Sequence, residues 1–176
     1  VIYSRRSVRK YSGQPVPDEI LEEILQAGLA APSAVNLQPW YFVAIQSREE
    51  REKFNAVMEQ VGEKVRAELE ERFPNHPDTV AESQRFIRSL GGAPVVILGS
   101  CYKEDYQNYE DDALESASAA MDNMLLTAYS LGLGGCWLTA PIQTGLAPAI
   151  QRTYAPGKGR PAGLLTSGFG ADGVGT

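Results

Sequence analysis

Apolar positions in the first part of the chain follow helical spacing and then strand spacing. In residues 18–31 they recur every three or four positions, which predicts an amphipathic helix that ends before Pro32. Residues 33–39 are polar and predict a loop, whereas the aromatic and β-branched run 40–45 predicts a buried strand. The helical apolar positions are Ile20, Leu21, Ile24, Leu25 and Leu29.

The next stretch predicts two helices separated by a turn. Ser47 and Glu50 form a capping-box pattern, and the apolar stripe between Phe54 and Leu69 marks the inner face of a long helix. Polar, turn-prone residues around 75–78 end it, and residues 79–90 predict another helix.

The second half alternates strands and helices. Its apolar runs and glycine clusters predict a strand at 94–99, a helix at 113–131 ended by the glycines of 132–135, a strand at 136–138, a helix at 141–154 and a strand at 162–168. This order predicts an α/β or α+β sandwich of sheet and helices. The length fits one domain spanning 1–176.

Composition excludes several classes of protein. The net charge of −6 argues against a nucleic-acid surface, and the apolar runs are shorter than a membrane span. Cys101 and Cys136 lie in apolar runs, so we expect reduced thiols in a cytoplasmic protein. His76 has no His or Cys cluster around it, so no metal site is expected. The chain begins at Val1 without Met, and we expect a short piece to precede it.

Three separated segments carry candidate chemistry. The basic segment, residues 5–11, offers guanidinium groups and a hydroxyl suited to a phosphate. The amide loop, residues 31–40, presents hydroxyl, amide and backbone donors, and the Gly-Trp segment, residues 132–141, presents a turn with few bulky side chains. Taken singly, each also fits an ordinary basic turn, a polar loop or a helix C-cap. The chain lacks G-x-G-x-x-G and P-loop motifs, which disfavours a Rossmann or P-loop enzyme.

Taken together, the three segments resemble the nitroreductase family of FMN-dependent enzymes. The shared patterns are an R-R-S-x-R start, an A-P-S-x-x-N-x-Q-P-W loop, and G-L-G before a W-[IL]-T strand end, in the same order over nearly the whole chain. The resemblance implies that the phosphate and ribityl contacts are Arg5, Arg6, Ser7 and Arg9; that the flavin-touching loop, usually from the partner subunit, contains Ser33, Ala34, Asn36 and Gln38; and that the flavin ring meets Trp137, Leu138, Thr139 and Ala140.

The same resemblance implies a fold and an activity. The fold is an α+β three-layer sandwich with a central, mostly antiparallel sheet, in a homodimer that embraces two FMN molecules at its interface. The activity is the reduction of nitro compounds, quinones or related small acceptors by NAD(P)H, with ping-pong kinetics. No catalytic side chain is required, because the cofactor carries the hydride chemistry.

The chain departs from the family near its end. Most members carry a Lys or Arg in the last segment that completes the phosphate clamp, yet no basic residue follows Arg160. Either Arg160 or Lys158 substitutes, or the clamp lies beyond these residues.

Three alternatives remain open. They are a specialised relative such as a reductive dehalogenase or a flavin-fragmenting enzyme, a flavin-binding protein without turnover, and a structural domain without cofactor. The Tyr-rich stretch 102–112 is either a surface loop or a lid over one substrate.

Overall fold

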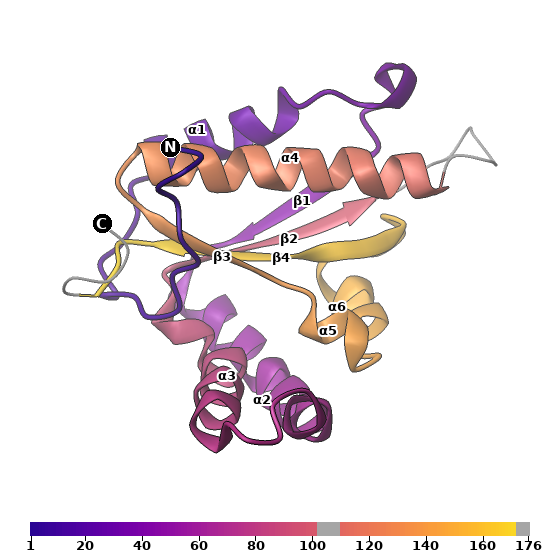
Figure 1. Cartoon of the computed structure of the whole chain (residues 1–176). Helices are drawn as coiled ribbons and strands as arrows, with labels where there is room; N and C mark the ends of the chain where they lie inside the picture. Colours follow the sequence, from indigo (N-terminus) through magenta and orange to yellow (C-terminus); the bar gives the residue numbers. More distant parts are fainter. Residues whose placement is uncertain (102–109, 172–176) are drawn as a thin grey trace.

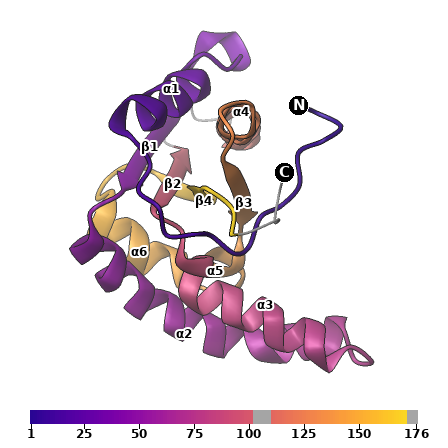
Figure 2. The same ribbon diagram turned by 90° about the vertical axis from the view of Figure 1, so that its left-hand side faces the viewer.

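The computed structural model describes residues 1–101 and 110–171, and these form a sheet with helices on both faces (Figures 1 and 2). Helices α1 and α4 cover one face, and α2, α3, α5 and α6 cover the other. The elements are α1 (Asp18–Leu29), η1 (Ala34–Asn36), β1 (Trp40–Ile45), α2 (Arg48–Arg72), α3 (Pro77–Ser89), η2 (Leu90–Gly92), β2 (Val95–Cys101), α4 (Glu110–Ser130), β3 (Gly134–Leu138), α5 (Ala140–Gln143), α6 (Ala147–Tyr154) and β4 (Arg160–Gly168).

The sheet has the strand order β1-β2-β4-β3, and every neighbouring pair is antiparallel. The expected α+β class with an antiparallel sheet between helical layers is therefore confirmed. The register defines two ends of the sheet. Trp40, Cys101 and Arg160 lie side by side at one end, whereas Ser167 pairs with Gly135 and Val95 at the other. Strands β1 and β3 form opposite edges.

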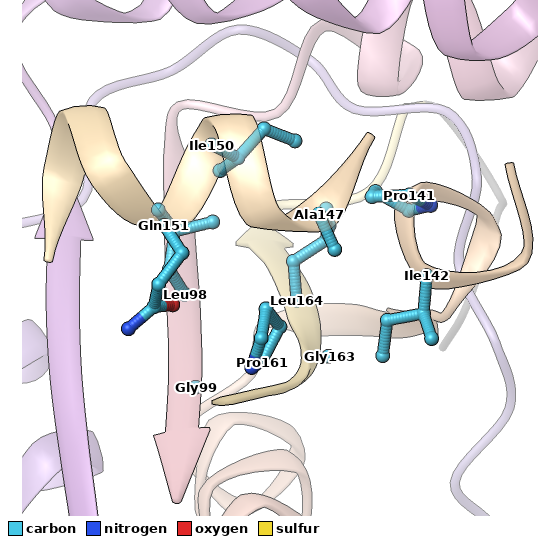
Figure 3. Close-up of a pocket in the computed structure, with 10 residues that line it drawn as sticks. All are labelled: Leu98, Gly99, Pro141, Ile142, Ala147, Ile150, Gln151, Pro161, Gly163 and Leu164. Atoms are coloured by element: carbon cyan, nitrogen blue, oxygen red, sulfur yellow. The ribbon is translucent and has the colours of Figure 1, made fainter. Parts of the chain in front are cut away.

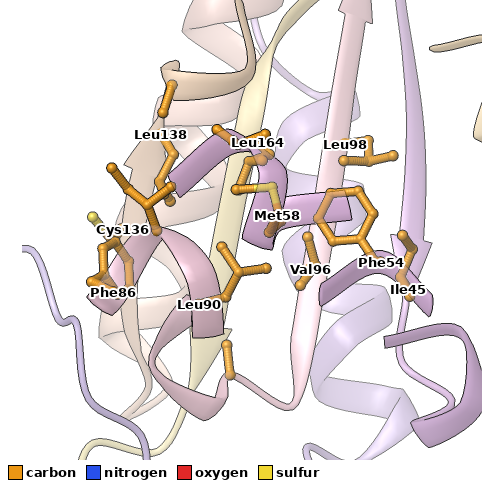
Figure 4. Close-up of a cluster of buried hydrophobic side chains, with 14 of the residues drawn as sticks. Ile45, Phe54, Met58, Phe86, Leu90, Val96, Leu98, Cys136, Leu138 and Leu164 are labelled. Carbon is orange, nitrogen blue, oxygen red and sulfur yellow. The ribbon is translucent and has the colours of Figure 1, made fainter. Parts of the chain in front are cut away.

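Two hydrophobic clusters fix the layers onto the sheet. On the α2/α3 face, Phe54 and Met58 are fully buried among side chains of all four strands (Figure 4). On the α1/α4 face, α4 places Ala117, Ala120 and Met121 against the sheet with no measurable exposure. Small alanines let α4 pack closely against the strands.

Most predicted elements are confirmed, and the Ser47 hydroxyl caps α2 by accepting from the Glu50 amide at 3.2 Å. One prediction is wrong: residues 141–154 form two helices instead of one. Gly145 adopts φ +73° and ends α5, after which α6 begins at Ala147. Strands β2, β3 and β4 extend beyond the predicted ranges. The stretch 102–112, interpreted as either a surface loop or a lid, falls mostly outside the described residues.

Candidate functional site

The basic segment is held at the edge of the sheet by backbone hydrogen bonds. The Val8 amide donates to the Gly135 carbonyl at 3.0 Å, and Ser7 forms a parallel bridge with Gly135. Farther along, the Tyr11 amide donates to the Gly91 carbonyl at 3.0 Å. Val8 is buried and its neighbours alternate outward, as in any extended chain. The side chains of Ser7 and Arg9 are therefore presented together to solvent.

Tyr11 anchors the end of this segment in the core. Its hydroxyl donates to the Val8 carbonyl at 2.8 Å and hydrogen-bonds with the Thr166 hydroxyl at 2.7 Å. Burial raises the pKa of the Tyr11 phenol above its ordinary value, although the hydrogen bond with Thr166 opposes the shift. The neutral phenol thus makes two hydrogen bonds, which hold residues 8–11 in one conformation.

Several cations of the basic segment have no acidic partner. Across the described ranges 1–101 and 110–171, no carboxylate lies within ion-pair distance of Arg5, Arg9 or Lys10. The guanidinium of Arg9 lies 6.0 Å from the centre of the Phe86 ring. Arg6 differs, because its guanidinium donates to the carbonyls of Tyr3 and Arg5 at 2.8 and 2.9 Å. Uncompensated positive charge at one edge of an acidic protein favours an anionic ligand.

An open groove of about 860 Å³ runs between the basic segment and α3. Ser7, Arg9 and Lys10 line one wall, and α3 contributes Arg85 and Ser89 to the other. Sequence reasoning did not select the α3 residues. Their four-residue spacing puts both on one helical face, but only the docking of η2 against residues 9–11 turns that face toward the arginines.

The Gly-Trp segment runs along β3, directly beside the basic segment. Leu138 and Ala140 are buried in the α2/α3 cluster, so only their backbone can meet a ligand. Thr139, between them, is exposed. The half-buried Trp137 points to the opposite face, where its indole N–H has no hydrogen-bond partner among the described residues.

The neighbouring Cys136 thiol is buried under the basic segment. Burial raises its pKa, an effect that Arg9, a hydrogen bond with Ser7 and the charge of Arg5 oppose. The bridge between Ser7 and Gly135, together with the effect of Arg5 and Arg9 on this pKa, is consistent with Arg5, Ser7 and Arg9 lying near the start of β3. The structure therefore brings the first and third predicted segments together.

The amide loop has a strained backbone. Val35, Asn36 and Gln38 all have positive φ, at +46°, +56° and +48°, although none is glycine. For Val35, a β-branched residue, the left-handed conformation costs about 1–2 kcal/mol. Such strain persists where the surroundings enforce it and is concentrated at functional loops.

Two hydroxyls hold that conformation. The Ser33 hydroxyl accepts from the Gln38 amide at 2.9 Å, and the buried Ser116 hydroxyl of α4 accepts from the Ala34 amide at 3.2 Å. Ser116 also donates to the Asp112 carbonyl at 2.7 Å. The amide loop is thus fixed to the start of α4.

The amide loop lies far from the basic segment within one chain. It leads into Trp40, at the end of the edge strand β1, whereas Ser7 lies beside Gly135 at the other end of the opposite edge, β3 (Figure 1). Strands β2 and β4 lie between these corners. One protomer therefore does not assemble all the predicted site residues.

Lys158 and Arg160 also lie away from the basic segment. Arg160 starts β4 and forms an ion pair with Asp111 at 3.9 Å, and Lys158 lies 5.0 Å from the Tyr41 ring centre. Arg160 and Ser167 are at opposite ends of β4, about 23 Å apart at strand spacing. Within one chain, neither cation completes the arginine cluster.

Comparison with known proteins agrees with these motifs. The sequence profile of the Nitroreductase family matches residues 2–168. The chain belongs to this family. The expected family and oxidoreductase class are thereby confirmed.

Individual nitroreductase-family relatives cover nearly all of the chain. A Methanothermobacter thermautotrophicus protein, provisionally named an NADH dehydrogenase/NAD(P)H nitroreductase, is 30% identical over 99% of this chain and 78% of its own. A Bacteroides fragilis nitroreductase crystallised with bound FMN superimposes with a TM-score of 0.71 at 26% identity, covering 98% of this chain and 87% of its own. A BluB-like flavoprotein from Clostridium difficile superimposes with a TM-score of 0.73 at 25% identity, covering 99% of this chain and 90% of its own.

A second pocket of this nitroreductase-family chain lies between α5, α6 and the sheet (Figure 3). Leu98, Ile142 and Leu164 make its lining apolar. The side-chain amide of Gln151 donates hydrogen bonds to the carbonyls of Ala155 and Lys158, each at 3.0 Å. Its cavity of about 20 Å³ holds no more than a water molecule. It is too small for a flavin.

Among the described residues, no group of three or more His, Cys, Asp or Glu is placed to hold a metal ion. None of the described helices combines the length and apolarity needed to span a bilayer.

Proposed function

We propose that this nitroreductase-family chain acts as a homodimer that binds FMN between its protomers and uses NAD(P)H to reduce a small acceptor such as a nitro compound or a quinone. One observation carries the proposal: the unpaired cations of the basic segment and the strained amide loop lie at opposite corners of the chain. A second copy, with its amide loop against the first copy's basic segment, would bring them together, and two-fold symmetry would give two such sites.

The residues that line the groove, together with Arg5 of the basic segment, fit the chemistry of FMN. Arg5 and Arg9 would bind the phosphate through charge-assisted hydrogen bonds, with Ser7 as a further donor. Arg85 and Lys10 add positive charge to the same groove, which holds Glu82 as its acidic residue. When bound, FMN supplies the hydride chemistry that no side chain of the groove provides.

The chain's own residues have binding and orienting roles. Thr139 and the backbone of Leu138 and Ala140 would contact the ring edge, and the amide loop of the partner subunit would contact it from the other side. Positive charge in the groove would stabilise negative charge that develops on the ring, which is an electrostatic role rather than acid–base catalysis. NAD(P)H and the acceptor then bind in turn, which predicts ping-pong kinetics.

The test begins with the purified protein. We expect flavin absorbance and, after denaturation, release of FMN identified by mass spectrometry. Addition of NADH or NADPH without oxygen should bleach the flavin bands rapidly in a stopped-flow instrument. Bound FMN with negligible bleaching would instead identify a carrier without turnover, and a colourless protein that binds no added FMN would overturn the proposal.

A further inference from the structure

We propose that Gly91 is a positioning residue that fixes the position of Arg9 in the groove between the basic segment and α3. This inference rests on the proposed function, in which that groove binds FMN. Gly91 lies in η2, between α3 and β2, and it lines the groove without a side chain of its own. Its role is exerted through the backbone of the basic segment.

The contact between Gly91 and the basic segment leaves no room for a side chain. Gly91 has φ +64°, and a Cβ built on it would overlap the Arg9 carbonyl group, lying 2.8 Å from the carbonyl carbon. On the other side, the Gly91 carbonyl accepts the Tyr11 amide at 3.0 Å. Residues 9–11 are thus held against η2 by a hydrogen bond and by direct backbone contact. Any side chain at position 91 must displace the Arg9 backbone.

Gly92 provides a matched contrast in the same turn. It also has positive φ, at +74°, but a Cβ built there meets nothing within 4 Å. Alanine at either position therefore carries similar backbone strain. Only alanine at position 91 also displaces the Arg9 backbone. The difference in FMN affinity between the two variants therefore separates the positioning effect from the effect of backbone strain.

Ser89 completes this arrangement from α3. Its exposed hydroxyl accepts from the Gly91 amide at 3.2 Å and donates to the Arg85 carbonyl at 2.9 Å. Gly91 is therefore tied both to the helix that forms one wall of the groove and to the segment that forms the other. The width between Arg9 and Arg85 depends on this link.

The test measures FMN affinity by quenching of flavin fluorescence as the full-length apoprotein is titrated. We expect Gly91→Ala to weaken FMN binding roughly tenfold more than Gly92→Ala, since a displaced charge-assisted contact is worth about that much. In an Arg9→Ala background, Gly91→Ala should add almost nothing, because it acts through Arg9. Hydrogen exchange should show a faster Tyr11 amide in Gly91→Ala and an unchanged one in Gly92→Ala.

Equal FMN affinities for the two alanine variants, or an undiminished effect of Gly91→Ala without the Arg9 side chain, would overturn the inference. Should Gly91→Ala not fold, Ser89→Ala replaces it, because this exposed change removes the hydroxyl that accepts from the Gly91 amide and adds no strain at position 91. It should weaken FMN binding roughly threefold with Arg9 present and have no effect in Arg9→Ala; an additive effect would refute positioning. If the wild-type protein itself fails to bind FMN, the proposed function fails instead.

Discussion

Arg5 and Arg9 carry charges that no carboxylate in the described part of the chain neutralises. If they bind the FMN phosphate, Arg5→Ala combined with Arg9→Ala should lower FMN affinity by roughly 100-fold or more, since each charge-assisted bond contributes about 1.5–3 kcal/mol. The measurement is FMN retained after gel filtration and the dissociation constant by titration.

The control for this pair removes the same charge elsewhere. Arg48 and Arg66 are exposed on α2, each paired with a glutamate four residues later. Replacing both with alanine should leave FMN affinity within about twofold, since exposed pairs contribute little. Equal FMN content in both double variants would count against the phosphate assignment.

Tyr11 makes the unfolding free energy of the protein fall as the pH becomes alkaline. Its phenol pKa is raised in the folded protein, so the unfolded chain loses this proton at a lower pH than the folded one does. Burial of the neutral phenol therefore favours the folded state below about pH 10 and is progressively lost as the pH rises above that value. Tyr11→Phe should cost about 1–2 kcal/mol at neutral pH through lost hydrogen bonds.

Urea unfolding between pH 7 and 11 would measure both effects. Tyr11→Phe should flatten the decline of unfolding free energy on the alkaline side. A decline as steep as that of the wild type would show that Tyr11 is not its source.

The amide loop depends on a contact from another element. Ser116→Ala removes the hydroxyl on α4 that accepts the Ala34 amide. We expect a loss of about 1 kcal/mol in unfolding free energy, and several-fold weaker FMN binding by the dimer because the strained loop would relax. Ser118→Ala, a change of the same size two residues along α4, is the control in thermal melts and titrations. Equal FMN affinities would contradict the proposed loop role.

Helices and strands with strong local patterns were predictable, whereas junctions and the assembly of the site were not. The Ser47 cap and the buried strands follow from local propensity, so their sequence signals agree with the fold. The break at Gly145 was missed because apolar spacing continues across it and only the positive φ separates α5 from α6. Arg85 was missed because its place in the groove depends on η2 packing against the basic segment, a contact between residues remote in sequence.

The proposed dimer makes cofactor binding a property of two chains. A monomer has the basic segment and the amide loop at opposite corners, so neither alone should hold FMN tightly. We expect sedimentation to show a dimer at micromolar concentration. On dilution, release of FMN and dissociation of the dimer into protomers should occur together. A persistent monomer that retains stoichiometric FMN would contradict this arrangement.

The docking of the basic segment also has a consequence for biosynthesis. Residues 7–12 are synthesised long before their backbone partners, which include Gly135, Phe169 and Gly170. Such distant pairings form late, because closing a long loop of chain costs entropy before any contact is gained. The nascent chain therefore cannot form this edge until residue 170 has been synthesised, and under the proposed function FMN would bind only after that point.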